Sequence, residues 1–259
     1  MKWKVPTNYE SLTLQIVIAT EKPIVIQIMC ESADIRNCKY TNRYKTVTGT
    51  QSLFIRMPLT TKNAVLEVYN KAVGNTETDN SFKVISITKN PLHRKIDFID
   101  ITDFRLKDFV SFAQKFCINA GELEPNIYVS ENGKFKVQYD KTITDRTGTK
   151  ELNTPARVNA VTGVIEISRV KFIPMTYPMR LAILLHEYAH LNMNENADDE
   201  SEADLNALNV YLSLGYPRIE AHEAFLSTFE NVATKTNAKR YALIKNFIED
   251  FEKNNIQFK

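Results

Sequence analysis

The sequence predicts an α+β protein, with an all-β, sandwich-like domain over residues 1–92 and a helix-rich domain over residues 93–259. Two observations support this division. The first third of the chain is a series of short β-branched segments separated by turn-forming residues, whereas the remainder is dominated by helical patterns of apolar residues. The 259 residues are 43% apolar and 25% charged, as in soluble globular proteins, and suffice to bury two cores.

Within the first domain, strands are expected at residues 12–19 and 24–29, with a turn at 21–23 between them. A second expected turn, at Thr48 and Gly49, separates two further segments. The remaining predicted strands are 44–47, 52–57, 64–69 and 82–88. Short strands at this spacing are typical of a β-sandwich.

The second domain is expected to begin near residues 90–94. Apolar residues at helical intervals predict a helix over 104–120, and Thr176 and Pro178 are suited to the start of a helix that continues through His190. Asp198 or Asp199 would cap the following helix, which extends to Leu214. The other predicted elements are a hairpin at 127–139, a hairpin at 157–168, and helices at about 217–233 and 238–253.

The helix over residues 180–191 contains the motif H-E-x-x-H, formed by His186, Glu187 and His190. Two histidines four residues apart lie on one helical face, where both imidazoles can reach a single metal ion and the glutamate can reach a water beside it. Buried histidines can also be satisfied by hydrogen bonds alone. Two of them beside a carboxylate in an apolar helix favour a metal site, because burying all three without a purpose would be costly.

A third ligand is expected from the acidic residues that follow. On a helix, Glu200 and Asp204 share the stripe that packs inward, whereas Glu202 falls on the opposite, polar stripe. An inward carboxylate needs neutralisation, which zinc would supply for Glu200. Asp204 could then hold the outer nitrogen of a ligand histidine. The alternative is an acidic first turn that complements the helix dipole.

These motifs resemble the gluzincin metallopeptidases, in which H-E-x-x-H is followed by E-x-x-A-[DN] on a second helix, here Glu200 to Asp204. The continuation is similar to compact peptidases encoded with phages and mobile elements, and the resemblance covers roughly residues 100 to 215. It implies a zincin-like domain whose mixed sheet packs on the active helix. The gap from His190 to Glu200 is shorter than in most such families, which leaves the third ligand open.

The resemblance further implies a zinc-dependent endopeptidase, in which His186, His190 and Glu200 hold Zn²⁺ and Glu187 acts as general base toward a zinc-activated water. Tyr211 and His222 are candidates to stabilise the oxyanion, but a structural role is the favoured alternative for each. An extended substrate would pair with an edge strand above the active helix, and the half-open alternation of the segment after Gly163 makes it the candidate. That segment comprises Val164, Ile165, Glu166, Ile167 and Ser168.

The expected partner is a peptide or protein substrate, not a nucleic acid or a membrane. The 33 basic and 31 acidic side chains nearly balance, and no apolar run is long enough to span a bilayer. Three cysteines and the lack of a signal-like start indicate the cytoplasm, of a host cell if the chain is phage-encoded. Two alternatives are a structural subunit of a large assembly, such as a virion, with neighbouring subunits as partners, and a binding module with a structural metal.

Overall fold

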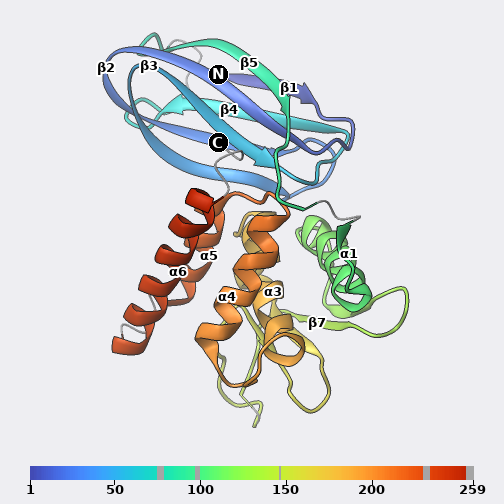
Figure 1. Cartoon of the computed structure of the whole chain (residues 1–259). Helices are drawn as coiled ribbons and strands as arrows, with labels where there is room; N and C mark the ends of the chain where they lie inside the picture. Colours follow the sequence, from blue (N-terminus) through green and yellow to red (C-terminus); the bar gives the residue numbers. More distant parts are fainter. Residues whose placement is uncertain (75–78, 97–99, 146, 230–233, 255–259) are drawn as a thin grey trace. The chain divides into compact units, whose positions relative to one another are not determined.

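The computed structural model describes residues 1–74, 79–96, 100–145, 147–229 and 234–254, and it confirms an α+β protein. The chain divides into two compact units, Met1–Leu92 and His93–Lys259. Figure 1 shows the elements of each unit, coloured along the sequence. Among the described residues, no helix combines the length and apolar character needed to cross a membrane.

The first unit is one antiparallel sheet of five strands, in which β2 pairs with β3, β4 and β5, and β1 pairs with β4. The strands are β1 (Lys2–Pro6), β2 (Leu12–Ser32), β3 (Lys39–Met57), β4 (Asn63–Asn70) and β5 (Lys83–Pro91). The first half of β2 pairs with β5 and its second half with β4. One long strand therefore joins the two halves of the sheet.

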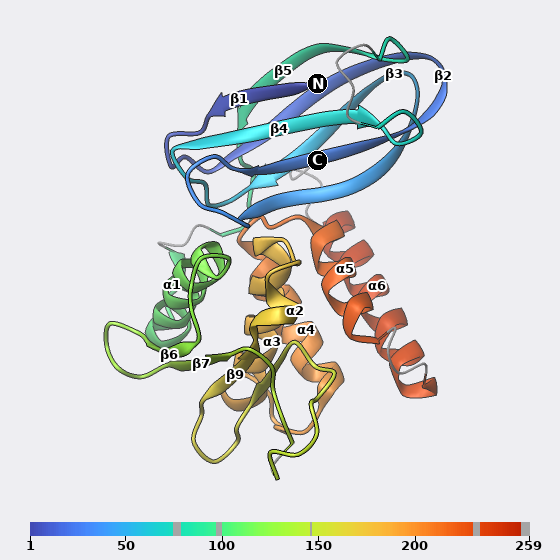
Figure 2. The ribbon, with the colours of Figure 1, turned by 180° about the vertical axis from the view of Figure 1, so that it is seen from behind.

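The predicted sandwich of two sheets is replaced by this single sheet, which bends along the long β2–β3 hairpin that Figure 2 shows from behind. The Sγ of Cys30, in the second half of β2, lies 3.9 Å from the Sδ of Met57, at the end of β3, so the two halves of the sheet touch. Alternate residues of β2 are buried against this shared core. All three cysteines of the chain are buried thiols.

The two turns predicted inside this hairpin are wrong. Residues 21–23 form a bulge within β2, where the register shifts between Thr20 and Ile24. Gly49 lies within β3 at a φ of +64°, a conformation that glycine adopts without strain. Bulges and turns favour the same residue types. The residues at these positions therefore indicate that the chain changes direction, but not whether β2 and β3 stay hydrogen-bonded on both sides of the change.

The second unit contains a mixed sheet of four short strands in the order β6-β7-β9-β8. Strands β7 and β9 are parallel, and the other two pairings are antiparallel. The bounds are β6 (Asn126–Val129), β7 (Lys136–Asp140), β8 (Ala156–Val158) and β9 (Ile165–Ser168). Both predicted hairpins are present, and β9 also joins them into one sheet.

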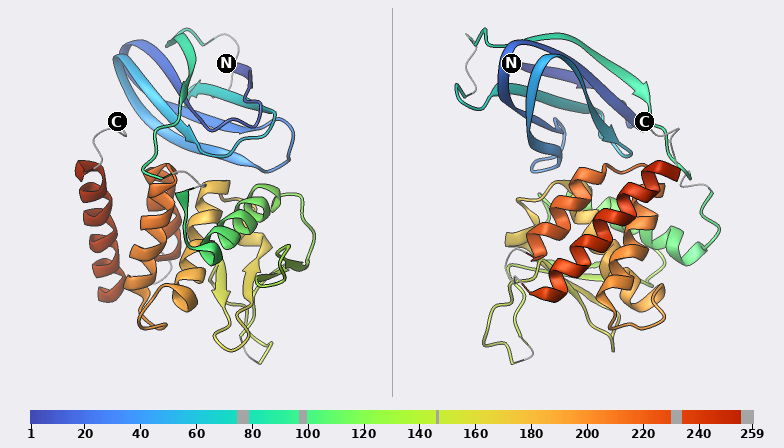
Figure 3. Two further views of the ribbon diagram at one scale, coloured as in Figure 1. Left: turned by 45° about the vertical axis from the view of Figure 1, so that its right-hand side comes forward. Right: turned by 60° about the vertical axis from the view of Figure 1, so that its left-hand side comes forward.

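Helices make up the rest of the second unit, as the two views in Figure 3 show. They are α1 (Phe104–Asn119), α2 (Arg169–Phe172), α3 (Tyr177–Asn192), α4 (Glu200–Ser213), α5 (Arg218–Phe229) and α6 (Lys235–Asn254). Helix α3 is central and contacts α1, α4, α5 and β8. Stacking of Phe109 on Tyr188, with ring centroids 4.2 Å apart, joins α1 to α3. The part of the predicted helix at 217–233 that follows Phe229 lies outside the described residues.

Candidate metal centre

The start of α3 is fixed by its cap and by a buried arginine. Thr176 accepts a hydrogen bond from the Met179 amide at 3.4 Å, and proline occupies the first turn. The side chain of Arg180 is fully buried and donates to the carbonyl oxygens of Cys117, Phe172 and Ile173, each at 2.9 Å. These bonds attach α3 to the ends of α1 and α2, and so hold the helix that carries the histidines.

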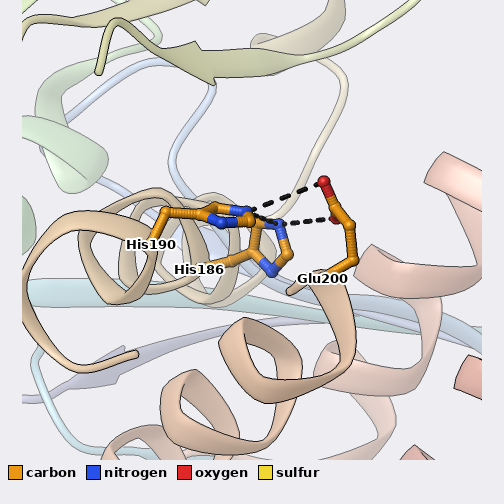
Figure 4. A group of neighbouring side chains, drawn as sticks. All are labelled: His186, His190 and Glu200. Atoms are coloured by element: carbon orange, nitrogen blue, oxygen red, sulfur yellow. Dashed lines mark hydrogen bonds and ion pairs between the residues drawn. The ribbon is translucent and has the colours of Figure 1, made fainter. Parts of the chain in front are cut away.

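The two histidines point their Nε2 atoms at one place, as the spacing on one helical face predicts (Figure 4). These atoms lie 3.0 Å apart, and the rings are nearly perpendicular, at 89°. The outer nitrogen of His190 contacts the carbonyl oxygen of Ala197 at 2.7 Å, so Nδ1 carries the proton and Nε2 offers its lone pair. The histidines are therefore oriented as a pair of nitrogen ligands.

Glu200 completes the group from the first turn of α4. Asp199 caps this helix by accepting from the amides of Ser201 and Glu202. The carboxylate of Glu200 lies 3.4 Å from Nε2 of His186 and 3.8 Å from Nε2 of His190, although half of its side chain is exposed. Glu202, expected to face solvent, instead accepts from the amides of residues 195 and 196 and closes the preceding loop.

The geometry of His186, His190 and Glu200, which together are called the metal group below, fits a divalent cation. One ligand atom from each of His186, His190 and Glu200 can be chosen so that all lie within 4.8 Å of one another. Zinc–nitrogen and zinc–oxygen bonds of about 2.0–2.2 Å in a tetrahedron separate neighbouring ligand atoms by about 3.3 Å. The two Nε2 atoms are 3.0 Å apart, and the two oxygens of Glu200 lie 3.4 Å (Oε2) from His186 and 3.8 Å (Oε1) from His190, all near that value.

The surrounding carboxylates shift the protonation of the group. Burial alone would lower the pKa of His186, but Asp204 and Glu200 outweigh it and raise that pKa to about 10. Hydrogen bonding to His186, opposed by partial burial, lowers the pKa of Glu200 to about 2. The pocket therefore favours positive charge between these side chains, which a metal cation would also supply.

Asp204 lies beside the outer nitrogen of His186, as the sequence predicts, but its main ion-pair partner was not predicted. Its Oδ1 is 3.0 Å from Nδ1 of His186, at an angle that departs from ordinary hydrogen-bond geometry. Arg240 of α6 binds the same carboxylate with two nitrogens, at 2.8 and 2.9 Å, and also lies 3.0 Å from Oε2 of Glu200. Arg240 thus neutralises a carboxylate that is only 1% exposed. No local signal distinguishes it from other arginines on an amphipathic helix.

Glu187 lies beside the metal group and is held by the sheet. Its Oε2 accepts a hydrogen bond of 2.7 Å from the backbone amide of Val158 in β8. The side chain is buried, and burial raises the pKa of its carboxyl group. A carboxylate with a raised pKa next to a metal group is suited to accept and return a proton.

The predicted substrate strand is wrong. Val164 precedes β9, and Ile165–Ser168 form an inner strand that pairs with β7 on one side and with β8 on the other. The alternating pattern of residues 165–168 shows that one face of the strand is buried. It does not show whether another strand pairs with it on each side. The edge next to α3 is β8, which also supplies the amide bound to Glu187.

The two candidates for oxyanion stabilisation are also wrong. Tyr211 is fully buried, donates its hydroxyl to the carbonyl of Pro217 at 3.1 Å, and stacks on Tyr216. The ring of His222 faces Tyr241 of α6, with centroids 6.1 Å apart, and does not line the cleft. Tyr211 shares a helical stripe with Glu200 but lies in the core, because Glu200 is the only residue of α4 that lines the cleft.

An open cleft of about 480 Å³ leads to the metal group. One wall is β8 with the residues that flank it, and the other comprises parts of α3, α5 and α6. Sequence reasoning had not assigned several of its lining residues, namely Ile183, Phe225, Asn237 and Arg240. The candidate metal group is thus accessible from solvent beside β8, which in the described part of the chain pairs with β9 alone.

Comparison of the chain with protein-family models, curated proteins and solved structures gave no match.

Proposed function

We propose that the second unit is a zincin-like, gluzincin-type peptidase that hydrolyses peptide bonds internal to a polypeptide with the help of bound Zn²⁺. The observation that carries this proposal is the arrangement of His186, His190 and Glu200 beneath an open cleft that also contains Glu187. A site built only for structure would be expected to close around its metal with a fourth protein ligand. Here the half-exposed side chain of Glu200 marks a side open to solvent.

Zinc is the proposed metal because two imidazoles and one carboxylate are a common donor set for catalytic zinc. Bound there, zinc would activate a water molecule and polarise the carbonyl of the peptide bond. The chain's own contribution is to orient both rings, through Ala197 on His190 and through Asp204 on His186. Arg240 forms a buried ion pair with Asp204, which offsets the cost of burying that carboxylate.

Glu187 is the proposed general base. It would take a proton at Oε1 or Oε2 from the attacking water as the water oxygen bonds to the peptide carbonyl carbon. It would then deliver that proton to the amine nitrogen as the C–N bond breaks. Burial, which raises its pKa, favours the protonated form that this second step requires. The Val158 amide fixes the carboxylate at the wall of the cleft, within reach of a substrate lying along β8.

The edge of β8 is the proposed place for the substrate backbone. The amide of Asn159 binds the carbonyl of Val164, and the amide of Ser168 binds the carbonyl of Pro155. Because hydrogen-bonded pairs alternate along an antiparallel ladder, Ala156 and Val158 turn their backbone groups away from β9. Glu187 binds the Val158 amide and Thr154 binds the Ala156 carbonyl, so the Ala156 amide and the Val158 carbonyl are the groups proposed to pair with a substrate. An extended polypeptide can pair with such an edge, which directs its scissile bond past Glu187 and the metal group.

The deciding experiment compares the wild-type chain with Glu187→Gln. Glutamine keeps the size of the side chain and can still accept from the Val158 amide, but it cannot carry the proton. Zinc content by mass spectrometry should be about one per chain for both proteins, and only the wild type should cleave an unfolded generic protein. Glu249→Gln, an exposed carboxylate on α6, is the matched control and should cleave normally.

Equal cleavage by wild type and Glu187→Gln, or cleavage by neither at full zinc occupancy, would refute the peptidase proposal. The second outcome would favour a structural subunit whose zincin-like domain serves as a scaffold. The open cleft over Glu187 is the feature that favours catalysis over that alternative.

A further inference from the structure

A second groove in the same unit lies between α1 and the hairpin β6–β7, which Figure 2 shows next to one another. Its volume is about 470 Å³, close to that of the catalytic cleft, and the two share no lining residue. The groove therefore has no part in the proposed peptidase site.

The groove has an aromatic floor. Asp108, Phe112 and Phe116 lie one helical turn apart on α1 and all line it. Phe116 packs edge-on against Tyr128 of β6, with ring centroids 5.6 Å apart, and Leu123 lines the groove as well. An apolar side chain entering from solvent would be covered by rings on two sides.

One wall of the groove is an open strand edge. Within the described part of the chain, β6 pairs with β7 alone. The amide of Ser130 binds the carbonyl of Phe135, so the alternation of the ladder turns the backbone groups of Ile127 and Val129 away from β7. The amide of Ile127 is capped by the Asn126 side chain at 2.8 Å, which leaves Val129 as the position where another strand can pair.

The charges at the groove specify what it would attract. Lys115 and Glu131 form an ion pair with each other. Asp108 accepts from the neutral amide of Asn132 at 2.6 Å, and no ion pair to a described cation is seen for it. The groove thus combines aromatic rings with one carboxylate that a lysine or arginine side chain could balance.

The dimensions suit an extended chain. From Asp108 to Asn119, α1 spans about 16 Å at 1.5 Å per residue. The four residues of β6 span about 13 Å. A strand of four or five residues added to β6 would therefore run the length of the groove, with alternate side chains facing its floor.

The geometry points to a docking site for an extended segment of a partner polypeptide, which adds a strand at Val129, places an apolar side chain on Phe112 and Phe116, and sets a basic side chain against Asp108. This mode of recognition takes affinity from backbone pairing and specificity from the pocket.

The test uses a fluorescein-labelled hexapeptide that alternates leucine or valine with threonine and one lysine, and it measures fluorescence anisotropy with the full chain. The wild type should bind saturably. Val129→Pro removes the outward amide without touching the ladder to β7 and should weaken binding at least about tenfold, whereas Val129→Ala should bind as the wild type does. Ser111→Arg, which fills the groove from α1, should also abolish binding. Thermal melting checks that each variant is folded.

Asp108→Asn should weaken binding of the lysine peptide more than that of a peptide with threonine in its place. Absence of saturable binding to the wild type would overturn the proposal. So would unchanged binding by both Val129→Pro and Ser111→Arg. A dimer in sedimentation that Val129→Pro dissociates would also overturn it, because a second copy would then occupy the edge.

Discussion

Replacing Asp204 by asparagine should weaken zinc binding without removing a ligand. The carboxylate is 1% exposed and faces two donors, Nδ1 of His186 at 3.0 Å and the guanidinium of Arg240 at 2.8 and 2.9 Å. An asparagine side chain has one acceptor oxygen, so its NH₂ group must face one of these donors. Loss of such a supporting partner costs about 10- to 100-fold in metal affinity. This corresponds to about 1.4–2.8 kcal/mol of binding free energy.

The assay is a competitive titration with a fluorescent zinc chelator at pH 7.5, with Glu249→Gln as the control for an exposed carboxylate. Removing one partner of a buried ion pair also destabilises the fold, by about 3 kcal/mol here, since Glu200 remains in contact with Arg240. Urea unfolding without zinc measures that separately. If the Asp204→Asn chain is folded and its zinc affinity is within twofold of the wild type, Asp204 has no role in orienting His186.

Three further predictions concern proton release on zinc binding, the stability that Arg180 gives to α3, and the backbone strain at Gly49 in β3. Because the pKa of His186 is raised to about 10, its imidazole is protonated at pH 7.5 before zinc arrives, and zinc uptake should release about one proton. Calorimetry in buffers of different ionisation enthalpy measures this number, and zero protons would contradict the assignment. Arg180→Met removes three buried hydrogen bonds to backbone carbonyls and should lower the free energy of unfolding by about 3–5 kcal/mol. Arg218→Met, at an exposed ion pair, should lower it by less than about 1 kcal/mol in the same urea titration. Gly49→Ala meets open space but keeps a φ of +64°, so it should cost about 1 kcal/mol of stability, and an unchanged melting temperature would refute strain there.

The elements that could be predicted from sequence are those whose signals are local. The helical spacing of His186 and His190, and the shared stripe of Glu200 and Asp204, follow from the geometry of one helix at a time. Caps at Thr176 and Asp199 are likewise local, and the structure shows both accepting amide hydrogen bonds. The α+β class followed from the same kind of pattern.

What could not be predicted depends on contacts between distant segments. Whether Ile165–Ser168 forms an edge or an inner strand is decided by the pairing of β7 with β9, about 28 residues apart. The partner of Asp204 is Arg240, 36 residues away on another helix. Residues 21–23 could turn the chain or bulge within a strand, and only pairing with β3 determines which.

Arg240 lies on α6, which follows α3 and α4 in the chain, and this order has a consequence for synthesis. The three ligand residues and Glu187 leave the ribosome before α6, so a nascent or truncated chain ending before residue 235 has every ligand but lacks the guanidinium that balances Asp204. In such a chain Asp204 and Glu200 lack their cationic partner. Synthesis of α6 is thus required before the candidate metal centre has its full set of charges.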